Sequence, residues 1–348
     1  MKNNKLIYLF IIIIAIWCLV LSFGQKDNKQ DINNEVINQV NVTGFSTDFT
    51  RIVEDNKDSI VTINCDGKLS SGFVYKQEEN NVYILCSYHG VADANNYAVS
   101  FSSGYKTNAE LVGTNIYLDL AVLKIDTPYE IKALEFGDEE LLKAGEFVIC
   151  IGTPKTIDFE QSVEMGMVSN NIKSIENNVS VNDENIIYFI DLIQLSANIK
   201  NGYSGSPVLN MNGEVIGMIT MSYNDEINFA TTAHEIKIVA DNIINGIEYK
   251  KYQLGISGSY VKQMPLFERS NLNLSVDTIS GLYINKIKES SILYLAGLRQ
   301  GDIISKINSV EINNRIDYLN VVYTNADSFE IEYIRNNEIQ TVKVDIND

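Results

Sequence analysis

The sequence predicts a mostly β protein, with a large β-rich domain, a smaller α+β domain after it and one apolar helix before it. Three observations predict this architecture. Short runs rich in β-branched and aromatic residues, with Gly, Asn or Asp nearby, recur between residues 59 and 231, as in a β-barrel or β-sandwich. After Gly246 the strand-like runs alternate with two short helical segments, and residues 6–23 are uncharged and mostly apolar.

Length and composition favour more than one globular domain. The 348 residues exceed the roughly 100 to 200 residues of a typical domain. The hydrophobic fraction of 45% and the charged fraction of 21% are ordinary for a protein that buries a core. The 27 basic and 45 acidic side chains give a net charge of −18, and no segment gathers the basic residues that nucleic acid requires. Nucleic acid is therefore not an expected partner.

The N-terminal segment, residues 1–24, is predicted to anchor the chain in a membrane. As a helix, residues 6–23 would be about 27 Å long, against ~30 Å for the hydrocarbon layer of a bilayer. Lys2 and Lys5 precede this run and favour a cytoplasmic N-terminus, with everything after Phe23 outside the cell membrane. A cleaved signal peptide is the alternative, because residues 22–24 resemble a cleavage site.

The remaining chain divides into three parts. Residues 25–48 are rich in Asn, Asp and Gln, which bury too little apolar surface to fold, so we expect a flexible linker. Residues 49–248 form the predicted β-rich domain, and residues 249–348 form the α+β domain, whose size is typical of a small independent fold.

In the β-rich domain the expected strands are short and are separated by turn-forming residues. They lie at 59–64, 72–75, 82–86, 97–101, 120–125, 147–151, 163–168, 186–193, 208–209, 215–220 and 227–231. Residues 235–246 are expected to form a helix that closes the domain, because Ile236, Val239 and Ile243 fall on one helical face.

In the α+β domain, strands and two helices alternate. We expect strands at 254–256, 282–287, 302–307, 329–334 and 341–344, and helices at 292–296 and 316–323. This mixture favours a sheet covered by helices.

Histidines are scarce, which narrows the search for a catalytic base. Of the two histidines, His89 follows an apolar strand and His234 opens the closing helix. A neutral imidazole can accept the proton of a serine hydroxyl near pH 7. We expect His89 to have this role and His234 to be structural.

Ser204 is the candidate nucleophile. It lies in Gly202-Tyr203-Ser204-Gly205, where glycines allow a sharp turn, so that the N–H groups of Gly202 and Ser204 can form an oxyanion hole. Asp119 begins an apolar strand, where its carboxylate can accept the imidazole N–H. The order His89, Asp119, Ser204 along the chain is that of chymotrypsin-like double β-barrels.

Neither a metal nor a cofactor is expected. Two isolated histidines offer no metal-ligand cluster such as H-E-x-x-H, and the cysteines form no C-x-x-C pair. Beyond the N-terminal segment, Cys65, Cys86 and Cys150 are expected to be buried thiols, with a Cys65–Cys86 disulfide as the alternative.

From about residue 58 to the C-terminus, the sequence resembles the HtrA/Deg family of serine proteases. The similar segments are 71–74, 84–89, 112–114, 120–124, 195–207, 213–217 and 228–230 in the β-rich domain, and 252–256 and 290–304 in the α+β domain. The resemblance implies a chymotrypsin-like double β-barrel followed by a PDZ domain. It implies proteolysis by His89, Asp119 and Ser204 through an acyl-enzyme.

The resemblance also implies binding sites. The specificity pocket would contain four residues: Asn198, Ile199, Ile227 and Phe229. The PDZ carboxylate-binding loop would contain five: Tyr252, Gln253, Leu254, Gly255 and Ile256. The implied partners are unfolded or misfolded proteins, C-terminal peptides and two further copies of the chain in a homotrimer. Tyr203 and Ser206 depart from the residues usual in the family, and Ser206 is expected to crowd the catalytic turn.

A function of another class is a non-catalytic adaptor or chaperone-like protein. Its protease domain would be vestigial, and its PDZ domain would bind exposed C-termini. The presence of all three catalytic side chains favours the enzyme.

Overall fold

The computed structural model describes residues 43–153, 158, 160–181, 184–223, 227–247, 254–274, 280–324 and 326–346. Residues 1–50 and 51–348 form two separate units. Of the first unit, only the beginning of helix α3 (Thr43–Asn56) is described; it begins within the segment expected to be a flexible linker. No helix in the described ranges is long and apolar enough to cross a membrane. The apolar run at 6–23 lies outside these ranges.

The first half of the β-rich domain is a closed barrel with the strand order β1-β2-β3-β6-β5-β4. It follows the 3-10 helix η1 (Lys57–Ser59) and contains the one-turn helix α4 (Tyr88–Val91). Its strands are β1 (Ile60–Cys65), β2 (Lys68–Glu78), β3 (Asn81–Ser87), β4 (Tyr97–Phe101), β5 (Lys106–Asn115) and β6 (Leu120–Asp126).

Alternating apolar residues fill this barrel. Val82, Ile84 and Cys86 of β3 are fully buried in one core, because every second residue of a strand faces the same side. Burying a Val or Ile side chain contributes about 1.5–3 kcal/mol, so this face fixes the register of β3 between β2 and β6. Strand β5 was not predicted, and most of its residues are exposed or half-buried.

The second half is another closed barrel, with the order β10-β11-β12-β9-β8-β7. The 3-10 helix η2 (Glu139–Leu141) precedes it. Its strands are β7 (Phe147–Gly152), β8 (Ser162–Val181), β9 (Glu184–Leu195), β10 (Pro207–Leu209), β11 (Val215–Tyr223) and β12 (Ile227–Thr232). Strands β8 and β9 form a long antiparallel hairpin.

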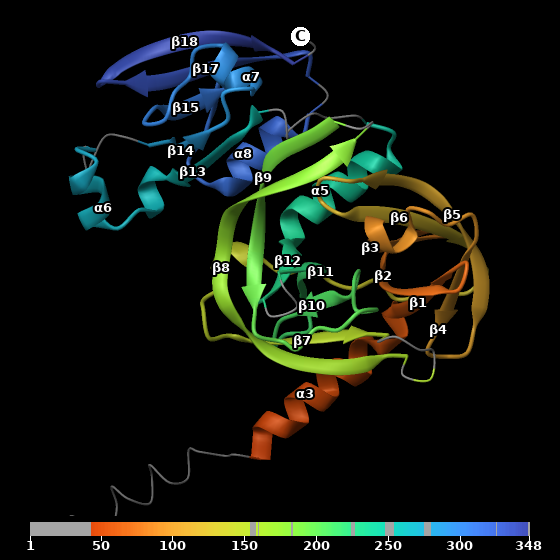
Figure 1. Cartoon of the computed structure of the whole chain (residues 1–348). Coiled ribbons are helices and arrows are strands. Elements are labelled where there is room, and N and C mark those ends of the chain that lie inside the picture. The colour runs from red at the N-terminus through yellow and green to blue at the C-terminus, as the bar shows by residue number, and fades with distance from the viewer. Residues whose placement is uncertain are drawn as a thin grey trace, which may run out of the picture. The chain divides into compact units, whose positions relative to one another are not determined.

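The two barrels lie side by side and share the closing helix α5 (Ala233–Ile244), as Figure 1 shows. This helix contacts β5 and β6 of the first barrel and β11 and β12 of the second. Its buried side chains include Ile236 and Val239, as expected from the helical period of its apolar residues.

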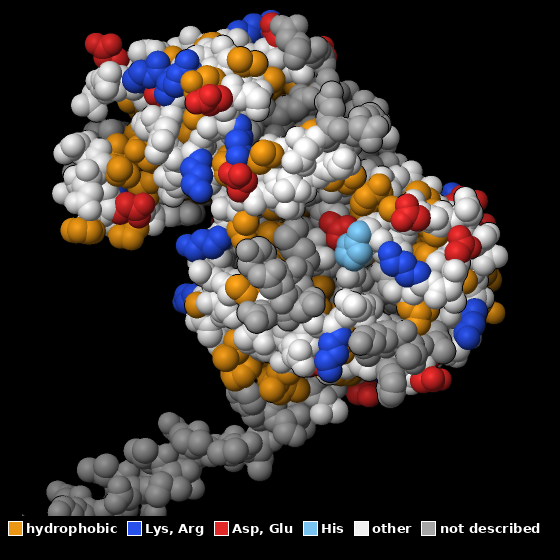
Figure 2. Space-filling view, in the orientation of Figure 1, with side chains coloured by type: hydrophobic (Ala, Val, Ile, Leu, Met, Phe, Trp, Pro, Cys, Tyr) orange, Lys and Arg blue, Asp and Glu red, His pale blue; other side chains and the backbone are white. Residues whose placement is uncertain are grey.

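Apolar side chains are exposed on the first part of β8. Val163, Met165 and Met167 are 45%, 54% and 41% exposed, and alternate residues of a strand point to one face. Figure 2 shows apolar side chains gathered along the lower edge of the barrels, where β8 runs in Figure 1. The second barrel therefore carries an apolar stripe on its surface.

The C-terminal domain is a six-stranded sheet with the order β13-β14-β15-β17-β18, and β16 pairs with β15. Its elements are β13 (Ile256–Tyr260), η5 (Val261–Gln263), α6 (Leu266–Asn271), β14 (Leu282–Ile287), α7 (Ile292–Leu295), β15 (Ile303–Ile307), β16 (Val310–Glu311), α8 (Arg315–Val322), β17 (Ser328–Arg335) and β18 (Glu338–Asp345). The strand expected at 254–256 instead begins at Ile256 and continues to Tyr260.

Candidate active site

Strand pairing brings His89 and Asp119 together. His89 lies on α4, directly after β3, and Asp119 directly precedes β6. These antiparallel strands pair Ser87 with Leu120, so the two residues leave the barrel at the same edge.

Asp119 binds the His89 segment through three of its oxygens. Its carbonyl accepts from Tyr88 N at 3.0 Å, and its Oδ1 accepts from His89 N at 2.8 Å. Oδ2 lies 2.7 Å from His89 Nδ1. Asp119 has a positive φ of 54°, a left-handed conformation that Asp adopts more readily than most residues.

The carboxylate determines which nitrogen of His89 is free. Because a carboxylate accepts hydrogen bonds, Nδ1 carries the proton, and Nε2 of the neutral ring is left as the acceptor. The side chain of His89 is 48% exposed and that of Asp119 only 16%. The ring therefore faces solvent while its carboxylate partner is largely buried.

Thr220 is a third partner that the sequence did not reveal. It lies on β11 of the second barrel, and its Oγ1 donates to Asp119 Oδ2 at 2.9 Å. Asp119 is thus held from both barrels. Thr220 ends a predicted strand, and no sequence motif distinguishes it from other strand threonines.

Glycines shape the turn that carries Ser204. Gly202 and Gly205 have φ values of 104° and 86°, which favour glycine. A Cβ on Gly205 would lie 2.2 Å from Ser71 O and 2.7 Å from Ser87 N. The serine turn therefore packs against the end of β3, two residues before His89.

In the turn that carries Ser204, two amides have no acceptor among the described residues. The amides of Tyr203, Gly205 and Ser206 donate to the carbonyls of Lys200, Ile219 and Tyr203, respectively. Among the described contacts, the amides of Gly202 and Ser204 have no acceptor. These are the two donors predicted for an oxyanion hole. Among the described residues, no hydrogen bond joins the Ser204 hydroxyl to His89.

The two unusual residues of the turn are buried. Tyr203 is 1% exposed, and burial raises its pKa to about 12. The Ser206 hydroxyl is buried without a partner among the described residues; a Cβ on Gly152 would lie 2.1 Å from it. Ser206 therefore occupies the space that Gly152 leaves empty.

The residues predicted for the specificity pocket have different surroundings. Asn198 is exposed, and Ile199 is half-buried against the core of the second barrel. Ile227 and Phe229 are half-buried on β12. No described contact joins the four residues, so the pocket stays a prediction.

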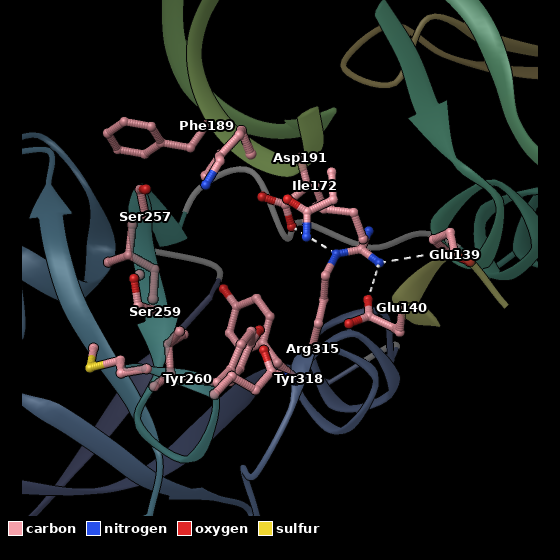
Figure 3. A pocket seen from close by; sticks show the side chains of 18 of the residues that line it. Glu139, Glu140, Ile172, Phe189, Asp191, Ser257, Ser259, Tyr260, Arg315 and Tyr318 are labelled. Atoms are coloured by element: carbon pink, nitrogen blue, oxygen red, sulfur yellow. Dashed lines mark hydrogen bonds and ion pairs between the residues drawn. The ribbon is translucent and has the colours of Figure 1, made fainter. Parts of the chain in front are cut away.

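Leu254, Gly255 and Ile256 of the predicted carboxylate-binding loop line a cavity of about 390 Å³; Tyr252 and Gln253 lie outside the described residues. Figure 3 shows β13 on one side of this cavity, and Phe189 and Asp191 of β9 lie opposite. Arg315 and Tyr318 of α8 complete its wall. The cavity is therefore lined by both the C-terminal domain and the second barrel.

Arg315 joins the two domains at this cavity. Its side chain is only 4% exposed and binds four carboxylates of the β-rich domain at 3.0 to 3.3 Å, those of Glu139, Glu140, Asp191 and Glu235. Figure 3 shows three of these contacts as dashed lines. Burial lowers the pKa of Arg315, but the carboxylate charges outweigh burial and raise it above its ordinary value.

The other candidate groups have no catalytic arrangement. His234 lies in the first turn of α5, and its backbone N–H donates to Glu139 Oε1 of η2 at 3.0 Å. Cys65, Cys86 and Cys150 are free, buried thiols, so the structure contains no Cys65–Cys86 disulfide. In the described part of the chain no group of side chains is suited to hold a metal ion.

Comparison with known proteins agrees with the fold. Residues 70–218 match the trypsin-like peptidase domain and residues 253–346 match the PDZ domain. The chain is 30% identical over 283 residues to the serine protease Do-like HtrA of Bacillus subtilis, covering 79% of this chain and 62% of that protein. The chain therefore combines a trypsin-like peptidase domain with a PDZ domain, and it is similar in sequence to HtrA-type serine proteases.

Other relatives give the same result. The serine protease Do-like HtrB of B. subtilis is 27% identical, over 78% of this chain and 60% of that protein. The chain thus spans about three fifths of the length of these two relatives. Among solved structures, an HtrA-type protease AlgW with a tripeptide has a TM-score of 0.57 and 24% identity, over 85% of this chain and 96% of that one. The fold is therefore that of HtrA proteases.

Proposed function

We propose that this chain is a serine endopeptidase of the HtrA type that degrades unfolded or misfolded proteins. The observation that supports this most is the 2.7 Å contact between His89 Nδ1 and Asp119 Oδ2, formed beside the turn that carries Ser204. It leaves Nε2 as a proton acceptor on the exposed side of the ring.

The proposed mechanism is acyl transfer. The Ser204 hydroxyl attacks the substrate carbonyl and gives its proton to His89, while Asp119 stabilises the resulting imidazolium. The amides of Gly202 and Ser204 stabilise the oxyanion. His89 then protonates the leaving amine, and a water molecule hydrolyses the acyl-enzyme. The Ser204–His89 hydrogen bond forms when substrate binds, since such bonds are often long without it.

The proposed specificity is for small or medium apolar residues. Asn198 carries no charge, and Ile199, Ile227 and Phe229 are apolar. A pocket without a buried charge discriminates weakly, by roughly 10 to 200-fold per methylene. Broad substrate use suits degradation of unfolded chains, which expose many apolar residues.

The PDZ domain is proposed to bind C-terminal peptides in the cavity beside β13. In PDZ domains a peptide adds a strand to the sheet, and loop amides bind its terminal carboxylate. Leu254, Gly255 and Ile256 line the cavity at the start of β13. The related AlgW structure carries a tripeptide, which supports the proposal.

The chain is further proposed to be anchored in the cell membrane by residues 6–23, with both domains outside. Two features support this proposal: the length of the uncharged run and the lysines before it. Membrane flotation of the full chain, compared with a chain lacking residues 1–24, tests it.

The apolar stripe of Val163, Met165 and Met167 supports the proposal of a homotrimer, because large exposed apolar patches mark protein interfaces. Light scattering should give three times the chain mass. Met165→Lys should lower that mass, and Glu110→Lys, on the exposed face of β5, should not.

Degradation of unfolded casein tests the proposed function. The protein should degrade casein, and Ser204→Ala should abolish degradation while it retains binding of a C-terminal peptide. If wild type and Ser204→Ala leave casein equally intact but still bind the peptide, the adaptor hypothesis replaces the enzyme.

A further inference from the structure

Ser71, on β2 of the first barrel, contacts the catalytic turn of the second barrel. Its side chain is fully buried. Its backbone N–H donates to Ser204 O at 3.1 Å, and its hydroxyl donates to Gly202 O at 2.7 Å. One residue of the first barrel thus holds the carbonyls of two residues in the turn.

A contact with Thr153 directs the proton of this hydroxyl. Thr153 N donates to Ser71 Oγ at 2.9 Å, and Thr153 is 1% exposed. A hydroxyl has only one proton, and the Thr153 amide occupies an acceptor site on Oγ. The proton of Ser71 therefore points to the Gly202 carbonyl.

The carbonyl that Ser71 binds belongs to the peptide group between the two oxyanion-hole amides. The Gly202–Tyr203 peptide group is held at its other end by the bond from Tyr203 N to Lys200 O at 3.1 Å. A peptide group is planar, so holding both ends fixes its rotation. Gly202 would otherwise rotate easily, because glycine has the widest backbone freedom.

We propose that Ser71 is a positioning residue that aims the amides of Gly202 and Ser204 at the oxyanion. This inference rests on the proposed protease function. Oxyanion donors accelerate the reaction because they are oriented before charge develops. Loss of the Ser71 hydroxyl lets the Gly202–Tyr203 peptide group rotate and weakens stabilisation of the transition state more than binding of substrate.

The test is steady-state kinetics of the full chain with a fluorogenic peptide, together with binding of a peptide boronate, which mimics the tetrahedral intermediate. Ser71→Ala should lower kcat by roughly tenfold or more, with KM within about twofold, because oxyanion-hole losses appear in kcat. Boronate affinity should fall by the same factor as kcat/KM. Ser71→Cys should be intermediate, because a thiol is a weak donor.

Ser59→Ala is the matched control. Ser59 is also buried, at 1% exposure, and its hydroxyl donates to Lys132 O at 2.7 Å. Ser59→Ala should lower stability as much as Ser71→Ala does. Its kcat should stay within about twofold of the wild-type value, because Ser59 lies outside the site.

Two results would overturn the proposal by itself: unchanged kcat and boronate affinity in Ser71→Ala, or equal kcat losses in Ser71→Ala and Ser59→Ala. If Ser71→Ala does not fold, Ser71→Cys provides the test: a kcat equal to that of the wild type would overturn the proposal. A wild-type protein that neither cleaves the peptide nor binds the boronate would overturn the proposed function as well.

Discussion

At the scale of single residues, Asp119 receives hydrogen bonds from both barrels. His89 contacts it from the first barrel and Thr220 from the second. The carboxylate is largely buried, so each hydrogen bond to it is protected from competing water. Asp119 is therefore oriented partly within the first barrel and partly by the Thr220 contact, which exists only when the two barrels are joined.

Thr220→Val should lower kcat with little change in KM. The substitution removes a hydrogen bond to a charged carboxylate, worth about 1.5–3 kcal/mol, which corresponds to roughly tenfold or more in rate if the bond orients Asp119. Thr231→Val is the control, because its hydroxyl bonds a backbone carbonyl, Met218 O. Equal kcat values for the two variants would contradict this role of Thr220.

Gly205→Ala should prevent formation of the catalytic turn. The added methyl group would lie 2.2 Å from Ser71 O in a backbone conformation with φ of 86°. The variant should lose about 1–3 kcal/mol of stability, measured by urea unfolding. It should also lose peptidase activity, measured by hydrolysis of a peptide substrate. Gly104 also has a positive φ, but the space around it is open. Gly104→Ala should therefore keep its peptidase activity.

At the scale of secondary-structure elements, strands with alternating apolar residues could be predicted, and β5, which lacks them, could not. The expected strand at 97–101 is β4, and that at 282–287 is β14, because their apolar residues alternate. Strand β5 has no such pattern, since its residues are mostly exposed or half-buried. It forms because its backbone pairs with β4 and β6.

The same difference applies to the candidate site. The first barrel joins His89 and Asp119 through the pairing of β3 with β6, and motifs in the sequence identify both residues. Thr220 and Ser71 act through contacts between barrels, which no local pattern encodes. Arg315 lies in a different domain from its four partners, so its contacts could be found only from the folded chain.

The three buried thiols should be unreactive in the folded protein. Burial raises the pKa of Cys65 to about 11 and that of Cys150 to about 12, and raises that of Cys86 well above its ordinary value. The thiolate is the reactive form, so iodoacetamide at pH 8 should leave all three unmodified. After denaturation without reductant all three should react; a persistent Cys65–Cys86 disulfide would contradict the free thiols.

At the scale of the whole molecule, Arg315 connects the PDZ domain to the barrels. Four carboxylates surround one guanidinium that is nearly excluded from water. Burying a charge lowers the stability of the folded protein unless an opposite charge is buried beside it. Removing one partner of a buried ion pair lowers stability further, because the remaining charge stays buried without an opposite charge. The relative placement of these two domains therefore depends strongly on Arg315.

Arg315→Ala should destabilise the protein by about 3–5 kcal/mol at pH 7. This loss of stability should become smaller as the pH falls toward 5. Burial already raises the pKa of Glu140, so its carboxyl becomes protonated more readily, and a neutral carboxyl does not need a cation beside it. Thermal unfolding at both pH values measures this. Arg51→Ala, which breaks an exposed pair with Asp55, should change stability by less than about 0.5 kcal/mol. A similarly small effect of Arg315→Ala would contradict the importance of this contact.

Covalent labelling with a fluorophosphonate probe tests most directly whether the two barrels form a working active site. Mass spectrometry of the labelled protein should locate the phosphonyl group on Ser204 alone, and His89→Ala should slow labelling by at least a hundredfold, because the base that activates the hydroxyl is gone. A folded protein that reacts no faster than its His89→Ala variant, or that reacts at a different serine, would contradict the assignment.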